Sequence, residues 1–364
     1  MKKILLFFRG IYNGGTEAES YTLMTMLKNK YELYYTYIDL DNSDKITLSK
    51  FNTVAKYIPI TEKFEIDTIL FCTQALKELD IIKQNFTYKK SYFWYHYDSE
   101  NQKNFLKEAL EGACDGAIAV SNTSRNQLIK LPFMTDKMKE KIIVINNVID
   151  TNRILSIADD EIEYDFTHSL NLVTVARIAP EKRLDRVISI AKELEKRNID
   201  YIWLIIGKVN KLNCTDYEKS LQKEFEEHPN IIFIGEKDNP FKYMKKADYS
   251  LLLSDRETWG LVITESKIVN TPCVVTSFPA AFEQIEDSFN GLILDTSKED
   301  YVNIVDRILS EKDKLKQNLK DFKYNNASLL DKWYNILWNI KRTKIWYLSI
   351  PCSFFGQLFV SYPI

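Results

Sequence analysis

The stretch DYSLLLSDRETWGLVITE, residues 248–265, joins a short apolar strand to a helix and decides how the chain is expected to fold. DYSLLLS (248–254) predicts the strand, and the apolar spacing after Gly260 indicates the helix. In an open parallel sheet, ligands gather beyond the carboxyl ends of the strands, where the free N–H groups of a following helix can hold an anion. Glu257 and Glu265 would flank this helix start and could accept hydrogen bonds from sugar or ribose hydroxyls. Chance also supplies such a pair in a chain with 51 acidic residues, so the rest of the chain must decide.

Outward from this stretch, the chain alternates strands and helices in two successive halves. Six apolar runs predict strands at 4–8, 32–38, 68–72, 92–97, 116–120 and 142–145, and six more at 172–177, 201–207, 231–235, 248–254, 273–277 and 291–294. Such alternation predicts parallel sheets with crossover helices. We therefore expect an α/β protein of two doubly wound, Rossmann-like domains that face an interdomain cleft.

An acidic stretch without clear period, near 158–165, separates the two halves. It predicts one domain over 1–160 and another over 161–327, because 364 residues exceed what a single core usually supports. A helix at about 328–344 has one apolar stripe and is expected to pack back on the N-terminal domain.

The last residues, 345–364, form an uncharged tail. It is long enough to reach across a bilayer core, but its proline, glycine and polar residues argue against a spanning helix. Packing on the N-terminal domain, an interfacial membrane contact or an atypical chain end are the alternatives.

Composition describes an ordinary folded protein. The chain is 45% hydrophobic and 27% charged, with a net charge of −2, which gives no electrostatic footprint for nucleic acid. Its five cysteines are odd in number and far apart, which favours reduced thiols and a cytosolic location over a zinc site or disulfide framework.

Two further motifs follow strands. Gly14 and Gly15, in NGGTEAES, would let the backbone approach a phosphate or sugar, although a purely structural turn fits this motif equally well. The dinucleotide fingerprint G-x-G-x-x-G is absent. Arg177 and Lys182 flank the turn RIAPEKR and would project into the same crevice as Glu257, where they could neutralise a diphosphate. A solvated charge run is the alternative.

Other polar residues give weaker signals. His96 lies near the exit of the aromatic strand YFWYHY and would face the cleft, with a structural role in the core as the alternative. His168 and His228 are expected at the surface. Asp39 and Asp41 are interpreted as a solvated acidic turn, and no metal site is expected.

Together these residues give the chain a resemblance to the family 4 glycosyltransferases, two-domain enzymes of the GT-B fold. The resemblance covers most of the chain, from the NGGTE turn to NGLIL (290–294). Its most specific parts are Arg177 with Lys182 and Glu257 with Glu265, in the right order and spacing. The chain looks particularly like bacterial enzymes of capsular or exopolysaccharide assembly.

The resemblance implies a donor site built from both domains. Arg177 and Lys182 would hold the donor diphosphate, Glu265 would bind the ribose, and Glu257 would contact the transferred sugar. Further contacts implied for the donor are those of His96 beside the sugar, Gly14 and Gly15 near the phosphate, Gly235 beside the base, and the backbone near Trp259, Gly260 and Leu261. Thr258 and Trp259 depart from the Gly and Phe common in the family, which leaves the donor's identity open.

The resemblance also implies an activity. It is the retaining, metal-independent transfer of a sugar from a nucleotide diphosphate sugar, with UDP expected, to a glycan or lipid-linked acceptor in surface polysaccharide biosynthesis. No cofactor is implied, the N-terminal domain would hold the acceptor, and peripheral contact with the inner face of the cell membrane is expected. A nucleotide-sugar 2-epimerase shares the fold and is the alternative, together with a noncatalytic sugar-nucleotide-binding subunit.

Overall fold

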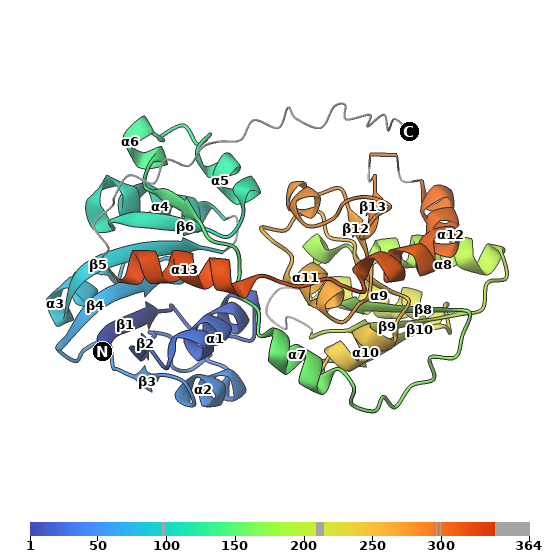
Figure 1. Cartoon of the computed structure of the whole chain (residues 1–364), viewed down its shortest axis with the longest axis horizontal. Coiled ribbons are helices and arrows are strands. Elements are labelled where there is room, and N and C mark those ends of the chain that lie inside the picture. Colours follow the sequence, from blue (N-terminus) through green and yellow to red (C-terminus); the bar gives the residue numbers. More distant parts are fainter. Residues whose placement is uncertain (97–98, 209–214, 296, 299, 339–364) are drawn as a thin grey trace, which may run out of the picture.

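The computed structural model describes residues 1–338 except 97–98, 209–214, 296 and 299, and leaves out the side chains of residues 215 and 222. Two parallel sheets organise this part of the chain (Figure 1). The first has seven strands in the order β3-β2-β1-β4-β5-β6-β7, and the second has six in the order β10-β9-β8-β11-β12-β13. We call each sheet with its covering helices the N-terminal lobe and the C-terminal lobe. The predicted α/β class with two doubly wound units is confirmed.

The N-terminal lobe alternates strands and helices as its sequence predicts. Its strands are β1 (Lys2–Phe7), β2 (Tyr31–Thr36), β3 (Lys56–Tyr57), β4 (Phe64–Phe71), β5 (Phe86–Tyr95), β6 (Gly116–Ala119) and β7 (Ile142–Val144). Its helices are α1 (Gly15–Leu27), α2 (Lys45–Asn52), α3 (Leu79–Asn85), α4 (Glu100–Glu108) with a π turn (Ala109–Ala113), α5 (Asn122–Leu128) and α6 (Asp136–Lys139). Only β3 among the described strands was not predicted, because two residues, one of them lysine, leave no apolar run.

The C-terminal lobe repeats the pattern after helix α7 (Thr151–Ile157). Its strands are β8 (Leu170–Val175), β9 (Tyr201–Ile206), β10 (Ile231–Gly235), β11 (Tyr249–Leu252), β12 (Cys273–Thr276) and β13 (Gly291–Leu294). Its helices are α8 (Asp185–Lys196), α9 (Thr215–Glu226), α10 (Phe241–Lys246), α11 (Leu261–Ile268) and α12 (Tyr301–Leu319), with 3-10 turns at Pro180–Lys182 and Pro279–Glu283. Ile149 and Ile154 pack in the core of this lobe. Helix α7 therefore belongs with the second sheet, although it precedes the acidic stretch at 158–165.

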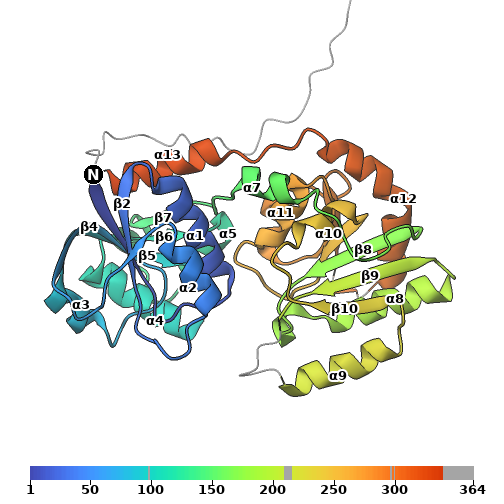
Figure 2. The same ribbon diagram turned by 90° about the horizontal axis from the view of Figure 1, so that it is seen from below.

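The last described helix, α13 (Asn326–Leu337), returns to the N-terminal lobe (Figure 2). Its apolar stripe, which includes Leu329 and Trp333, is buried in the same cluster as Ile4 and Trp94. The indole rings of Trp94 and Trp333 lie 4.8 Å apart, edge to face. Within residues 1–338, the described part of the chain therefore crosses between the lobes twice, once before α7 and once before α13.

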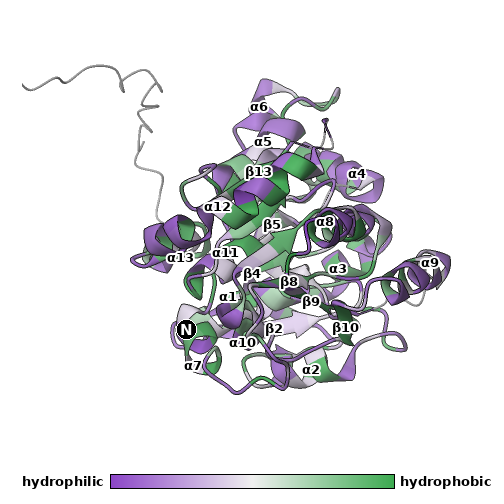
Figure 3. Ribbon diagram, turned by 90° about the vertical axis from the view of Figure 1, so that its right-hand side faces the viewer, coloured by the Kyte–Doolittle hydropathy of each residue, from purple (hydrophilic) through white to green (hydrophobic). Residues whose placement is uncertain are grey.

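The cores follow the hydropathy of the sequence. Hydrophobic strands lie inside, and helices such as α6 and α9 turn hydrophilic residues outward (Figure 3). Within the described ranges, no helix is both long and apolar enough to cross a membrane. The tail at 345–364 lies outside the described residues.

Candidate functional site

The start of α11 is shaped by one glycine. Gly260 has φ +85°, in the left-handed region, and no side chain caps the helix that begins after it. A Cβ atom there would lie 3.2 Å from Leu252 Cδ2 and 3.3 Å from Ile263 Cδ1, so both conformation and space require glycine. The first N–H groups of α11 are thus left without a competing side chain, as an anion site needs.

Lys182 and Glu257, predicted from separate motifs, meet directly. Lys182 Nζ donates to Glu257 Oε1 at 2.6 Å, and the Ser254 hydroxyl donates to the same oxygen at 2.8 Å. Their side chains are only 16% and 15% exposed, so this pair is shielded from the water that weakens surface ion pairs. The turn after β8 therefore places its lysine against the loop after β11.

Arg177 stands slightly apart from that pair. Its Nη2 donates to Glu181 Oε1 at 3.1 Å, and its side chain is half exposed. The two loops are nevertheless joined, because Asp255 N donates to the carbonyl of Glu181 at 3.0 Å. The buried Arg186 adds a second bond, from Nη2 to Asp255 Oδ1 at 2.7 Å. Its position on α8 could not be recognised from spacing alone.

Glu265 lies half-buried on α11, and its carboxylate has no hydrogen-bond partner among the described residues. Burial raises the pKa of Glu265 to about 7, and the charge of Arg153 opposes this rise. A half-buried carboxylate left with free lone pairs is suited to accept hydrogen bonds from hydroxyl groups.

The loop at Thr258 joins the two lobes. The Thr258 hydroxyl donates to the carbonyl of His96, and the Ser121 hydroxyl donates to the carbonyl of Thr258 at 2.7 Å. Trp259, buried in the core of the N-terminal lobe, has its carbonyl held by Gln284 Nε2 at 2.6 Å. Bonds from both lobes therefore fix the segment between Glu257 and α11.

The glycine turn lies on the other side of this contact. A Cβ atom at Gly15 would lie 3.8 Å from Leu261 Cδ1, so the turn from Gly14 into α1 faces the start of α11. Asn13 Nδ2 donates to the carboxylate of Glu236, which places the loop after Gly235 opposite the same turn. The structure thus brings together the Gly14–Gly15 turn, the loop after Gly235 and the start of α11.

Two carboxylates on α1 were missed by the sequence reasoning, which considered only the glycines of NGGTEAES. Glu17 and Glu19 are both buried, and burial raises the pKa of each carboxyl. Glu17 accepts a hydrogen bond from Tyr12 N at 3.3 Å, and Glu19 Oε2 lies 3.1 Å from His96 Nδ1. Glutamates in a polar-looking turn gave no sign of burial, because the partner of Glu19, His96, lies far along the chain.

Several weaker expectations can be placed as well. The prediction that His228 lies at the surface is wrong. The residue is 5% exposed, and its Nδ1 lies 2.9 Å from Glu195 Oε1. Asp39 is partly exposed and accepts a hydrogen bond from the Tyr12 hydroxyl at 3.1 Å.

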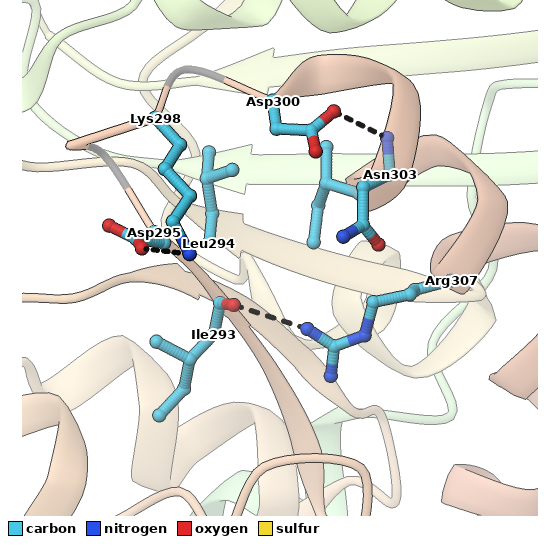
Figure 4. A pocket seen from close by; sticks show the side chains of 8 residues that line it. Ile293, Leu294, Asp295, Lys298, Asp300, Asn303 and Arg307 are labelled. Atoms are coloured by element: carbon cyan, nitrogen blue, oxygen red, sulfur yellow. Dashed lines mark hydrogen bonds and ion pairs between the residues drawn. The ribbon is translucent and has the colours of Figure 1, made fainter.

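A small hollow between β13 and α12 lies apart from these residues (Figure 4). Its charged groups already have partners: Asp295 pairs with Lys298 at 3.4 Å, Asp300 caps α12 at Asn303 N, and Arg307 Nη1 donates to the Ile293 carbonyl at 3.3 Å. These bonds secure the start of α12 and leave little free for a ligand.

Comparison with known proteins finds similar chains and a matching family model. Residues 163–326 match the model of the family described as glycosyl transferases group 1. The chain is 24% identical to the capsular polysaccharide biosynthesis glycosyltransferase CapH of Staphylococcus aureus, over 76% of this chain and 81% of the relative. It is 23% identical to the N-acetyl-alpha-D-glucosaminyl L-malate synthase of Bacillus anthracis over 52% of this chain, and spans 48%, about half, of that relative's length.

Solved structures show the same fold. HepE of Anabaena, in complex with UDP-glucose, is similar with a TM-score of 0.73 and 16% identity, over 93% of this chain and 99% of that one. The pneumococcal O-GlcNAc transferase GtfA, in complex with UDP and GlcNAc, has a TM-score of 0.66 and 11% identity, over 92% and 98% of the chains. The chain has the GT-B fold, and its predicted resemblance to glycosyltransferases is confirmed.

Proposed function

We propose that the chain is a glycosyltransferase that moves a sugar from a nucleotide diphosphate sugar to an acceptor hydroxyl, with retention of configuration and without a metal ion. The observation that carries this proposal is the meeting of Lys182, Glu257 and the uncapped start of α11 with the Gly14–Gly15 turn. Positive charge, free N–H groups and a carboxylate are then available at one contact between the lobes. The donor would lie along it.

Each group has a distinct task in this proposal. Arg177, Lys182 and the first turn of α11 would stabilise the negative charge that develops on the leaving diphosphate. Glu257 would accept hydrogen bonds from the transferred sugar, and Glu265 would accept them from the ribose. The bond from the anomeric carbon to the diphosphate breaks as the acceptor oxygen bonds on the same face. The acceptor's proton passes to the departing phosphate oxygen.

The donor base and the acceptor class are also proposed. UDP is favoured because HepE and GtfA have the same fold and are complexes with UDP-glucose and with UDP plus GlcNAc, respectively. A glycan or lipid-linked acceptor in surface polysaccharide biosynthesis is favoured by the similarity to CapH. The acceptor would approach from the N-terminal lobe.

The decisive experiment measures transfer and binding by the purified full-length chain. A panel of nucleotide sugars is tested for binding and slow hydrolysis, with and without candidate acceptors and with EDTA. Lys182→Ala and Arg177→Ala are each expected to lower the rate about 10²-fold, while Lys192→Ala, on the exposed side of α8, serves as the matched control. Wild-type rates in both active-site variants would refute the assignment.

The same panel separates the alternatives. A 2-epimerase would change the sugar of the donor with no acceptor present, whereas a noncatalytic subunit would bind the donor and never consume it. Retention is read from the anomeric configuration of the product. Loss of transfer in EDTA would contradict the proposed metal independence.

We also propose peripheral membrane contact through the uncharged residues 345–364. The full chain should sediment with anionic vesicles, and a chain ending at residue 344 should sediment less. Equal sedimentation of both chains would refute this contact.

A further inference from the structure

We propose that Glu19 is a positioning residue for His96: it holds the imidazole at Nδ1, so that Nε2 is the nitrogen presented to the donor sugar. This inference rests on the glycosyl transfer proposed above. It adds a residue to which the family resemblance assigns no role. Glu19 would act only through His96.

The geometry of the pair is closed to solvent. Glu19 Oε2 lies 3.1 Å from His96 Nδ1, and their side chains are only 2% and 5% exposed. Glu19 lies on the first turns of α1, just after the Gly14–Gly15 turn, and His96 directly follows β5. Water does not compete for this hydrogen bond, so the pair differs from exposed ion pairs, which contribute little.

The hydrogen bond decides which ring nitrogen carries the proton. When Glu19 is ionised, its carboxylate has no hydrogen to donate, so the hydrogen between Glu19 and His96 belongs to Nδ1. The neutral ring then has its lone pair on Nε2. Nε2 is buried and has no partner in the described part of the chain. Because a buried polar atom without a partner costs free energy, a sugar hydroxyl that donates to Nε2 would be favoured there.

Other contacts fix the position of His96 but do not decide which of its ring nitrogens carries the proton. The imidazole packs against Trp94 with ring centroids 4.4 Å apart, and the His96 carbonyl accepts the Thr258 hydroxyl of the other lobe. Neither contact involves a ring nitrogen of His96. Glu19 is therefore the group among these that can select the tautomer.

A purely structural role explains Glu19 less well. Its second oxygen, Oε1, is buried and has no partner among the described residues. Burying a carboxylate with one hydrogen bond is costly, and an apolar side chain would stabilise the lobe at least as well. The free-energy cost of burying Glu19 is explained if its carboxylate sets the tautomer of His96, the residue proposed to contact the donor.

Nitrogen-15 NMR of the full-length chain tests this directly. The chain has only three histidines, so labelled histidine gives few signals, and His96→Ala identifies those of His96. In the wild type, Nδ1 should appear protonated and Nε2 unprotonated. Glu19→Gln keeps an oxygen that can accept from Nδ1 and should retain this pattern, whereas Glu19→Met offers only a weakly accepting sulfur and should move the proton to Nε2.

Kinetics provide the second readout. Glu19→Met should lower kcat about 10-fold or more, as loss of such an orienting partner commonly does, and Glu19→Gln should restore most of the rate. In a His96→Ala background, Glu19→Met should lower the rate no further. Ser20→Ala, a fully buried neighbour on α1, is the control and should leave both tautomer and rate unchanged.

Several outcomes would overturn the proposal. They are a wild-type His96 that carries its proton on Nε2, a Glu19→Met chain with an unchanged tautomer, and additive losses in the double variant. If Glu19→Met does not fold, the wild-type and Glu19→Gln spectra still decide. The tautomer is measured without donor, so failure of sugar transfer in the nucleotide-sugar panel remains a separate result.

Discussion

Glu265 offers the sharpest test at the level of single residues, because its burial has opposite consequences for stability and binding. The folded pKa of about 7 lies above the usual value of 4.5. Between these pH values the folded chain keeps a proton that the unfolded chain has lost, so stability falls as pH rises through this window. Glu265→Gln cannot ionise and should be more stable than wild type at pH 8, by roughly 1 to 3 kcal/mol.

Donor binding by Glu265 should show the reverse trend. The ionised carboxylate can accept two ribose hydroxyls, so wild-type affinity for the donor should rise as pH rises through 7. Glu265→Gln should bind about 10-fold more weakly at pH 8 and lose this pH dependence. Calorimetric titration at pH 6 and 8, with thermal unfolding of the same samples, measures both effects. A less stable variant at pH 8 would contradict the burial argument.

The positions of site residues could be predicted from the sequence where those residues directly follow a predicted strand. Lys182 and Glu257 stand after predicted strands, so their approach to one crevice could be inferred from topology. Glu19 could not be found in this way. Its contact with His96 is made far along the chain, and no local pattern encodes it.

At the level of elements, the start of helix α11 can be tested by replacing Gly260. Gly260→Ala would place a Cβ in a left-handed conformation and against Leu252 and Ile263. We expect a loss of stability of about 1 to 2 kcal/mol and a displaced helix start, and therefore weaker donor binding. Denaturant unfolding and donor titration measure the two losses.

Gly112→Ala is the matched control. Gly112 also has positive φ, at +148°, but a Cβ there would meet nothing within 4 Å. It lies in the π turn after α4. This variant should lose stability and leave donor affinity unchanged. Equal losses of affinity in both variants would show that α11 holds no special place in binding.

Helices and strands could be predicted from the sequence where the pattern of apolar residues and the length of the run both indicated the same element. Long apolar runs such as 201–207 and 231–235 correspond to β9 and β10, because buried parallel strands need continuous apolar sequence. The two-residue β3 has no such signal. The uncapped start of α11 was readable because the local sequence has glycine and no capping side chain.

At the scale of the whole molecule, Thr258 and Glu283 hold the lobes together. The Thr258 hydroxyl reaches the His96 carbonyl, and Glu283 accepts hydrogen bonds from the backbone N–H groups of Asn122 at 3.0 Å and Thr123 at 2.6 Å. Thr258 is also a departure from the glycine common in the family. These bonds should favour the closed arrangement before any donor arrives.

The double variant Thr258→Val, Glu283→Gln keeps side-chain volume and removes one donor and one charge. Each lost bond is worth about 1 to 2 kcal/mol, so the lobes should separate more often and the radius of gyration in solution scattering should increase. A saturating nucleotide sugar should reverse the increase, because a donor that contacts both lobes favours the closed state. KM for the donor should rise more than kcat falls. Glu286→Gln, an exposed neighbour, is the control, and an unchanged radius in the double variant would show that packing of Trp259 and α13 suffices to hold the lobes closed.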